Sequence, residues 1–294
     1  MYHFAKQFGK EVYIQNETFD DTTKAVVEEA FTKEERQQIF IKPSKAFKIA
    51  NATTIHIIVD TSELHMVESE AMLRKVDMHN IFILDHHRIS QLAEDVPMEN
   101  VYVDTSASSA SEIVSELMQF SSKLVKLPQR VSQLLLNGIY LDTKQFVKSS
   151  SSRTFAAAAW LESFGALSTK AAAILKLPER YTQIINQILS SVKEVKPGYF
   201  LSSYKGEVPV DIISLAADEI LRTQGRKVAV VIAKVPGKQM FKMSTRGIDT
   251  NVQVIAEAVG GGGHFNAAAA VSKEPIDIFE DNIISAIVSL KGEN

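Results

Sequence analysis

The chain has 294 residues, no cysteine and a net charge of −3, from 32 basic and 35 acidic side chains. The lack of cysteine excludes disulfides, thiolate metal sites and thiol nucleophiles, and the near-balanced charge provides no cationic surface for long nucleic acid. The length favours about two domains, and no apolar run approaches the ~18–20 residues that cross a bilayer.

The first part of the chain predicts strands that alternate with helices. A short helix at 2–8 and a strand at 11–15 come first, and three apolar runs then predict buried strands at Ile55–Val59, Ile81–Leu84 and Val101–Val103. A helical pattern lies between the first two runs. This alternation is typical of an α/β fold with a parallel sheet.

An acidic residue follows each of these three runs. Asp60 ends the first, Asp85-His86-His87 ends the second, and Asp104 ends the third. Ligands bind beyond the carboxyl ends of the strands in such sheets, so we expect Asp60 and Asp85 to His87 to share one functional edge. A single aspartate at a strand end is more often a cap or a turn former, and a histidine pair alone is more often a surface feature. The functional interpretation depends on the coincidence of several such ends.

Helices dominate the middle of the chain. Capped helices are predicted after Ser109 and after Ser151, and a longer helical region breaks at Pro197-Gly198. We therefore predict a first domain at 1–195 and a smaller α/β domain at 196–294. In the second domain, the pattern predicts strands near 199–204, 227–235 and 241–247, and helices at 211–221 and 251–259.

Carboxylates and imidazoles that could bind a metal lie at strand or helix ends: Asp60, Asp85-His86-His87 and Asp142. Oxygen-rich sites with some imidazole suit Mn²⁺ or Mg²⁺. Two such ions ~3.5–4 Å apart can hold a water nucleophile and a phosphoryl oxygen. The residues thus indicate metal-assisted phosphoryl chemistry without deciding which metal is used.

A run of four glycines, Gly260–Gly263, precedes His264-Phe265-Asn266. It is either a flexible loop or a turn whose backbone N–H groups cradle a phosphate. Ser244 and Arg246 lie near a predicted strand end and could hold the same anion, because arginine binds phosphate with a bidentate fork. The alternative for this pair is an exposed polar strand face.

Together these segments resemble the DHH phosphoesterase family with its DHH-associated second domain. The resemblance implies a parallel-sheet DHH domain joined by a helical linker to a smaller α/β domain. Within the family, the chain is most similar to the catalytic region of the membrane-anchored cyclic-di-AMP phosphodiesterases. Five segments carry the match in the family's order: IHIIVDTSE at Asp60, ILDHHRIS at Asp85, GIYLDTKQF at Asp142, FKMSTRG, and GGGGHFNAAAA.

The resemblance implies hydrolysis of cyclic di-AMP to linear pApA with two Mn²⁺ ions, Mg²⁺ being less favoured. By this resemblance Asp60 bridges the ions, while His86 and Asp142 complete the protein ligands of one ion. His87 faces the scissile phosphate, and Asp85 orients His86. The substrate-binding residues that it implies are Arg88, Ser244, Arg246, Gly261, Gly262, Gly263, His264 and Asn266.

One family motif has no counterpart here: an earlier strand that ends in a histidine and two aspartates and holds the other ion. We therefore expect either a fragment of a longer protein or a degenerate protein, and an impaired activity in this chain. The parent is expected at the cell membrane with this region facing the cytoplasm, and the chain as written is expected to be cytoplasmic. A homodimer is a further expectation from the resemblance.

Two other functions remain open. The same metal site with another nucleotide pocket would give a phosphoesterase for short oligoribonucleotides or pAp, similar to the nanoRNases. A module that binds an adenine nucleotide without catalysis would keep the second domain and lose the metal chemistry. A substrate panel of cyclic di-AMP, pApA and pAp separates these functions.

Overall fold

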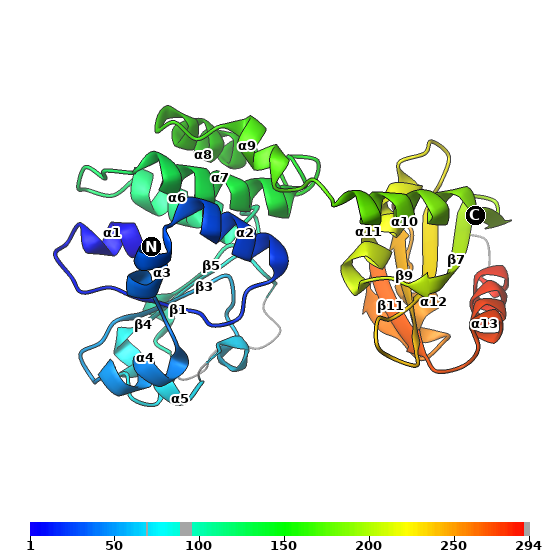
Figure 1. Cartoon of the computed structure of the whole chain (residues 1–294), viewed down its shortest axis with the longest axis horizontal. Coiled ribbons are helices and arrows are strands. Elements are labelled where there is room, and N and C mark those ends of the chain that lie inside the picture. The colour runs from blue at the N-terminus through cyan, green and yellow to red at the C-terminus, as the bar shows by residue number, and fades with distance from the viewer. Residues whose placement is uncertain (69, 89–95, 291–294) are drawn as a thin grey trace. The chain divides into compact units, whose positions relative to one another are not determined.

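The computed structural model describes residues 1–68, 70–88 and 96–290. The chain forms two compact units, Met1–Lys176 and Leu177–Asn294 (Figure 1). Each unit encloses hydrophobic clusters of its own. Within the described ranges, no helix combines the length and apolar character that a membrane crossing requires.

The first unit is built around the parallel sheet that the sequence predicts. Strands β3 (His56–Val59), β4 (Ile81–Asp85) and β5 (Val101–Val103) lie side by side in this order, and both pairs are parallel. The other elements of this unit are α1 (Tyr2–Lys6), β1 (Ile14–Gln15), α2 (Asp21–Ala30), α3 (Lys33–Ile39), β2 (Phe40–Ile41), α4 (Pro43–Ile49), η1 (Leu64–Met66), α5 (Glu70–Leu73), η2 (Met78–Asn80), η3 (Met98–Asn100), α6 (Ala110–Gln119), α7 (Gln129–Thr143), α8 (Ser152–Ser163) and α9 (Ser168–Ala173).

Both faces of this sheet are covered, which explains why its strands read as continuous apolar runs. Ile81 and Ile83 of β4 pack in a cluster with residues of α4 and α5, whereas Leu84 packs in another cluster with α6, α7 and α8 (Figure 1). Because the strands are parallel and in register, the polar residues that follow β3 and β4 meet at one edge.

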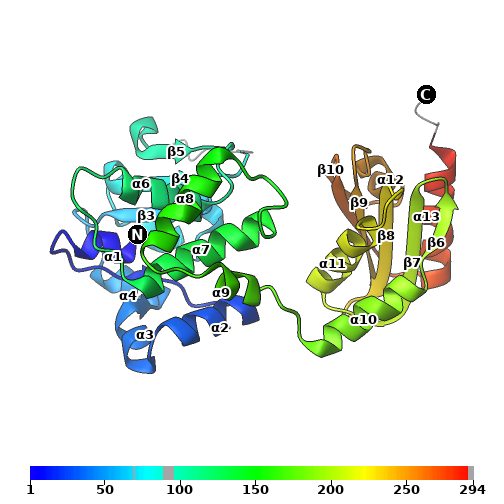
Figure 2. The ribbon, with the colours of Figure 1, turned by 90° about the horizontal axis from the view of Figure 1, so that it is seen from above.

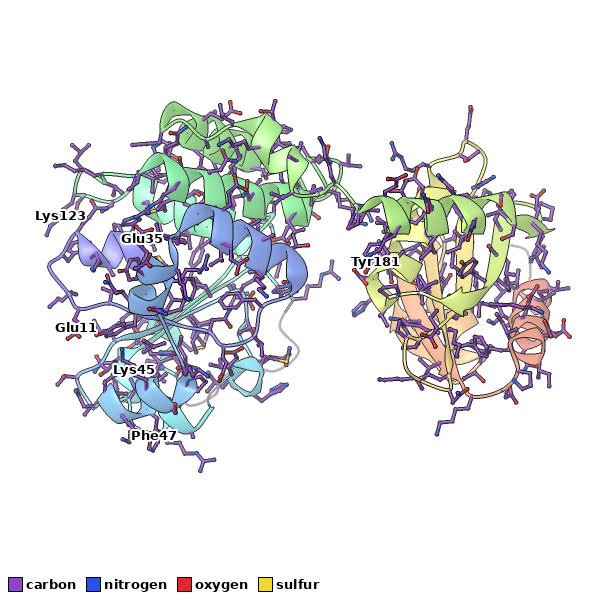
Figure 3. The ribbon with its side chains drawn as sticks, viewed as in Figure 1. Glu11, Glu35, Lys45, Phe47, Lys123 and Tyr181 are labelled. Atoms are coloured by element: carbon purple, nitrogen blue, oxygen red, sulfur yellow. The ribbon has the colours of Figure 1, made fainter. Side chains whose placement is uncertain are left out.

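The two short strands β1 and β2 form a separate parallel pair, in which Ile14 lies opposite Phe40. Helix α3, which leads into β2, begins with a reciprocal capping box between Thr32 and Glu35. The Glu35 carboxylate, labelled in Figure 3, also accepts a hydrogen bond of 2.6 Å from Arg130 of α7. This ion pair joins the N-terminal helices to the helical layer over the sheet.

A cluster of charged side chains fixes the helices to the end of β5. Arg153, in the first turn of α8, donates to Asp104 at 2.7 Å and to the two carboxylate oxygens of Glu116 on α6 at 2.6 and 2.8 Å. Asp104 directly follows β5, and its backbone N–H continues the ladder to Asp85 at 2.9 Å. Three elements therefore meet at one guanidinium, beside the edge that carries the candidate site.

We expect the Arg153 cluster to make stability depend on pH in acid. Hydrogen bonds from Ser106 and then from Arg153 hold the pKa of Asp104 below its ordinary value of 3.8. A depressed folded-state pKa contributes stability that is present above the unfolded pKa and is lost as pH falls through the folded pKa. The free energy of unfolding should therefore fall as pH drops below about 4. Chemical denaturation at several pH values in this range should show that the free energy of unfolding changes less with pH in Asp104→Asn than in the wild type. An identical change with pH in both proteins would contradict the role of Asp104.

The second unit is a six-stranded mixed sheet with helices on both faces. The strand order is β10-β11-β9-β8-β7-β6, and only β7 and β8 among these neighbours are parallel. Its elements are α10 (Glu179–Ser190), β6 (Lys193–Lys196), β7 (Tyr199–Glu207), α11 (Val210–Leu221), β8 (Val228–Lys234), β9 (Phe241–Gly247), α12 (Gln253–Glu257), β10 (Gly262–His264), β11 (Ala267–Ser272) and α13 (Ile276–Ser289).

The long helical region predicted before Pro197 is divided in the structure. Helix α9 ends at Ala173, Pro178 is the N-cap residue of α10, and residues 193–196 form a strand instead of continuing the helix. Proline has no N–H and disfavours helix in the residue before it, so a new helix begins after Pro178. Helix α10 packs with β7 and α11 and belongs to the second unit.

Helices lie on both faces of the sheet of this unit (Figure 2), and alternate residues of β8 face the two helical layers. Ala229, Val231 and Ala233 pack with α10 and α11, whereas Val228 and Val230 pack with α12 and α13. The period of two fixes the side on which each residue of the neighbouring strands lies. It therefore also fixes the face on which the polar residues of β9 are presented.

Candidate functional site

Asp60 lies directly after β3 and turns the chain out of the sheet. Its backbone N–H donates to the carbonyl of Leu84 at 3.0 Å, which extends the ladder by one residue. Its φ of 69° is left-handed, a conformation that aspartate tolerates better than most residues. The carboxylate is largely exposed and faces β4.

Asp85, the last residue of β4, is fully buried, and its carboxylate accepts hydrogen bonds from the residues that follow it. Its Oδ1 accepts hydrogen bonds from the backbone N–H of His86 at 2.8 Å and of His87 at 3.2 Å. The same oxygen contacts Nδ1 of the His87 ring at 2.8 Å. Burial favours a higher pKa for Asp85, but hydrogen bonds from His87 and Ser62 outweigh it and hold the pKa below the ordinary value.

The resemblance assigns Asp85 to orient His86, and here the structure differs. The Asp85 carboxylate holds the ring of His87 and reaches His86 through its backbone N–H alone. An ionised carboxylate accepts only, so Nδ1 of His87 carries the proton and Nε2 is left to act as an acceptor or ligand. The His87 side chain is exposed at this edge, as is Arg88 beside it.

His86 points one nitrogen at two carboxylates. Its Nε2 lies 3.3 Å from Oδ1 of Asp60 and 3.9 Å from Oδ2 of Asp142, which extends from the last turn of α7. The hydrogen bond to Asp60 raises the pKa of His86 against the effect of burial. Burial, followed by repulsion from Asp60, raises the pKa of Asp142. Two carboxylates that repel each other beside one imidazole are an arrangement that a cation stabilises.

Two of the predicted metal ligands, Asp60 and His86, therefore lie together with His87, and the third, Asp142, contacts His86 at 3.9 Å. Ligand atoms of Asp60, His86 and His87 all lie within 4.8 Å of one another. Carboxylate and imidazole donors without thiolate fit Mn²⁺ or Mg²⁺. Residues from the ends of β3, β4 and α7 thus provide one place where a divalent ion would be held.

In the second unit, Ser244 and Arg246 lie two residues apart on β9 and share the face covered by α10 and α11. Ser244 is buried, so the pair is not the exposed polar strand that the sequence left open. Arg246 Nη1 donates to Ser244 Oγ at 3.1 Å, and its Nε lies 3.4 Å from Asp218 of α11. Ser244 Oγ also lies 3.1 Å from the hydroxyl of Ser214.

Sequence reasoning missed Ser214 and Asp218. They are four residues apart on α11, so both point from one helix face toward β9. The available signal was weak, since polar residues at this spacing also occur on exposed helix faces. Their effect is to fix the Arg246 guanidinium before any ligand binds.

The second half of the glycine run, Gly262 and Gly263, lies in a strand and not in a flexible loop. Gly262–His264 form strand β10 at the edge of the sheet, antiparallel to β11. A Cβ on Gly261 would lie 2.2 Å from the carbonyl oxygen of Ala269 and 2.5 Å from the Cβ of Ala270. Glycine is therefore needed at position 261, because the neighbouring backbone approaches closely there.

Replacing Gly261 by alanine should destabilise the second unit by about 1–3 kcal/mol, because the added methyl group meets backbone that cannot move freely. Gly262→Ala is a matched control at the neighbouring position, since no atom lies within 4 Å of its Cβ position. Denaturant unfolding measures both variants. Equal stability of the two would contradict the close approach.

The residues around β10 share the face of Arg246. His264 lies opposite Ala267 of β11, which lies opposite Arg246 of β9. This lateral row places the side chains of His264 and Arg246 on one side of the sheet, about 10 Å apart across two strand spacings. Asn266 lies in the turn between β10 and β11, and its carbonyl accepts the N–H of Gly247. Three of the predicted substrate residues, Ser244, Arg246 and His264, thus share one face of the sheet.

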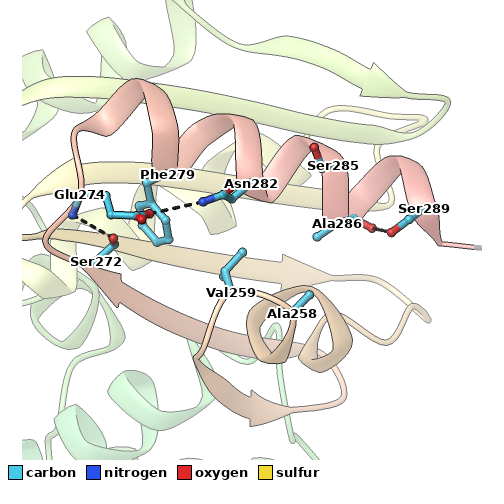
Figure 4. A pocket seen from close by; sticks show the side chains of 9 residues that line it. All are labelled: Ala258, Val259, Ser272, Glu274, Phe279, Asn282, Ser285, Ala286 and Ser289. Atoms are coloured by element: carbon cyan, nitrogen blue, oxygen red, sulfur yellow. Dashed lines mark hydrogen bonds between the residues drawn. The ribbon is translucent and has the colours of Figure 1, made fainter.

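A separate groove of about 550 Å³ lies on the opposite face, beside α12 and α13 (Figure 4). Its one carboxylate, Glu274, accepts a hydrogen bond from Asn282 at 3.3 Å. None of the predicted site residues line it. The lining residues are Ala258, Val259, Ser272, Glu274, Phe279, Asn282, Ser285, Ala286 and Ser289.

Comparison with known protein families agrees with this geometry. The DHH family, N-terminal domain, matches residues 1–139, and the DHHA1 domain matches residues 197–290. The chain therefore belongs to the DHH family and carries its DHHA1 domain. The family resemblance and the α/β fold inferred from the sequence are both confirmed.

Within the family, the chain is similar to curated proteins of one kind. The chain is 34% identical over 253 residues to cyclic-di-AMP phosphodiesterase GdpP of Geobacillus thermodenitrificans, covering 84% of this chain and 38% of the relative. It is 32% identical to cyclic-di-AMP phosphodiesterase PdeA of Listeria monocytogenes, covering 86% of this chain and 39% of that protein. The chain thus spans about two fifths of the length of these relatives.

A solved structure shows the same fold. An exopolyphosphatase-related protein of Bacteroides fragilis superposes with a TM-score of 0.76 at 16% identity, covering 98% of this chain and 85% of that one. At this identity the similarity concerns the fold alone.

Proposed function

We propose that this chain is the catalytic part of a metal-dependent phosphodiesterase that hydrolyses cyclic di-AMP to linear pApA. The observation that carries the proposal is the convergence of Asp60, His86 and Asp142 at the carboxyl edge of the sheet. The names of the relatives, cyclic-di-AMP phosphodiesterases over more than four fifths of this chain, support the choice of substrate.

Asp60, His86 and Asp142 would hold Mn²⁺, and a bound ion would polarise the phosphoryl oxygen and lower the pKa of water there. His87, held by Asp85, would direct Nε2 at the scissile phosphate. Arg88 would add positive charge beside it. On the second unit, Arg246 would bind a phosphate oxygen with its orientation set by Asp218. Ser244, Gly261, Gly262, Gly263, His264 and Asn266 would shape the nucleotide site.

We expect low activity from this chain. Among the described residues, the proposed set gives three protein ligands to one ion and only the shared Asp60 to a second. A single carboxylate holds a divalent ion weakly against water, so the two-ion arrangement would be incompletely populated. This expectation is separate from the substrate, which the second unit would still recognise.

The test is hydrolysis of cyclic di-AMP by the purified chain with Mn²⁺, followed by chromatography for pApA, with Asp142→Ala as control. Slow turnover that is lost in the control supports the proposal. Fast turnover that is lost in the control supports the substrate and contradicts the expected impairment. Faster cleavage of pApA or pAp than of cyclic di-AMP would favour the oligoribonucleotide phosphoesterase. Binding without turnover, unchanged in Asp142→Ala, would favour a nucleotide-binding module.

Two expectations on assembly and location complete the proposal. We propose a homodimer, which light scattering on the purified chain tests directly. We also propose that this region faces the cytoplasm as part of a longer membrane-anchored protein. Fractionation of cells that express the natural gene, with an antibody against this region, tests the location.

A further inference from the structure

Backbone strain among the described residues is concentrated at Asp60 and in the turn that follows Asp142, two of the predicted metal ligands. Among the described residues, six non-glycine residues have positive φ, and four of these are Asp60 at 69° and the consecutive residues Lys144, Gln145 and Phe146 at 47°, 60° and 64°. Each such residue costs roughly 1–2 kcal/mol in this conformation. Strain of this kind persists only where the surroundings enforce it, and it gathers at functional sites.

The left-handed turn Lys144–Phe146 begins two residues after Asp142 and is organised by Thr143. The Thr143 hydroxyl donates to the carbonyl of Ile139 at 2.6 Å and accepts from the backbone N–H of Phe146 at 2.9 Å. The Thr143 carbonyl accepts from Lys148 N–H at 2.8 Å. The side chain is completely buried, so these bonds are shielded from water.

Aromatic packing holds the far end of the turn. The ring of Phe146 stacks on Phe155 of α8, with ring centroids 5.1 Å apart and planes at 21°. It also meets Tyr140 of α7 edge-on at 4.9 Å. The turn is thus fixed to α7 by Thr143 and to both α7 and α8 by Phe146.

Asp142 needs such a constraint for two reasons. It lies in the last turn of α7, and helix ends fray unless they are capped or packed. Its carboxylate also faces Asp60 beside His86, and repulsion would turn it away before a cation arrives. A ligand must nevertheless be held within about 0.5 Å of its binding geometry.

We propose that Thr143 is a positioning residue, which locks the left-handed turn and thereby holds the Asp142 carboxylate toward His86 and Asp60. The inference rests on the proposed metal site and extends it to a residue that touches no metal. The energy lost to strain in the turn is offset by the Thr143 bonds and the Phe146 ring contacts. The gain is a carboxylate set for metal binding at the end of a helix.

Thr143→Val and Thr143→Ser test this role, with the Mn²⁺ dissociation constant from electron paramagnetic resonance of free Mn²⁺ as the readout. Valine keeps the shape and removes both hydroxyl bonds, so the affinity should fall about 10- to 100-fold, as for other residues that orient a ligand. Serine restores the hydroxyl, and its affinity should lie within about twofold of the wild type. Thermal unfolding of both variants accompanies the titration.

A second variant guards against misfolding of Thr143→Val. Glycine adopts positive φ without cost, so Gln145→Gly should offset part of the lost stability. The double variant Thr143→Val with Gln145→Gly should still bind Mn²⁺ weakly. Asp249→Gly relieves similar strain, at a φ of 48° in the second unit, and should not change affinity.

The possible results distinguish a failure of the positioning role of Thr143 from a failure of the proposed metal site. If Thr143→Val binds Mn²⁺ as tightly as the wild type but unfolds at a lower temperature, Thr143 is merely structural and the positioning role is overturned. If the wild-type chain binds no Mn²⁺, the proposed metal site fails and the positioning role fails with it. Tight binding by wild type and serine variant, with loss in both valine variants, supports the proposal.

Discussion

Replacing Asp60 by asparagine is expected to abolish tight Mn²⁺ binding and, with it, hydrolysis of cyclic di-AMP. Asp60 approaches Nε2 of His86 more closely than Asp142 does, at 3.3 against 3.9 Å, and it is the carboxylate proposed to serve both ions. Changes to residues that only orient a ligand cost 10- to 100-fold in affinity, so loss of a direct anionic ligand should cost at least about 100-fold. Asparagine tolerates the left-handed conformation at this position, so backbone strain stays the same. Isothermal titration with Mn²⁺ measures the change.

The chain contains a matched control for this substitution. Asp77 and His79 form a similar pair at the opposite end of β4, with 3.0 Å between a carboxylate oxygen and Nδ1. Asp77→Asn should leave Mn²⁺ affinity unchanged, because that pair lies outside the proposed site. If Asp60→Asn binds Mn²⁺ like the wild type, the proposed ligand set is wrong.

Asp85→Asn is expected to lower the rate of hydrolysis by about 10²- to 10⁴-fold with little change in metal affinity. The neutral amide loses the charge-assisted bond that holds the His87 ring and fixes its tautomer. Asp85 is not a proposed ligand, so metal binding should survive. Single-turnover hydrolysis with enzyme in excess measures the rate, since the chain itself is expected to be slow.

This result separates catalysis from metal binding. Nitrogen NMR of the His87 ring should show a protonated Nδ1 in the wild type and a mixture of tautomers in Asp85→Asn. His79→Ala serves as a control for the loss of an exposed histidine. An unchanged hydrolysis rate in Asp85→Asn would mean that Asp85 does not act through His87.

The parallel sheet of the first unit was predictable because its signal is local. Buried strands in such sheets are continuous apolar runs, and the predicted runs match β3, β4 and β5 within one residue at each end. The aspartates that end these runs mark the carboxyl edge, so the convergence of Asp60 with His86 followed from topology. The sequence also marked Asp142 as a candidate ligand, but its arrival from α7 depends on how a helix packs over the sheet, which the local sequence pattern does not determine.

Other features of the site could not be predicted, because the sequence carries no local signal for them. The bond from Asp85 to the His87 ring depends on how the chain turns after β4, which the letters Asp-His-His do not determine. Lys144, Gln145 and Phe146 carry no glycine to indicate a left-handed turn. The glycine run suggested either a flexible loop or a phosphate-binding turn, whereas pairing with the alanines of β11 places Gly262 and Gly263 in a strand. In each case a contact with a distant segment overrides the local preference.

The separation of the hydrophobic clusters into two units has a thermodynamic consequence. An ion held by Asp60, His86 and Asp142 binds the folded first unit alone, so its binding energy is linked to the unfolding of that unit. At a concentration 100 times its dissociation constant it would add about 2.7 kcal/mol there. An anion held at Arg246 would in the same way be linked to the unfolding of the second unit.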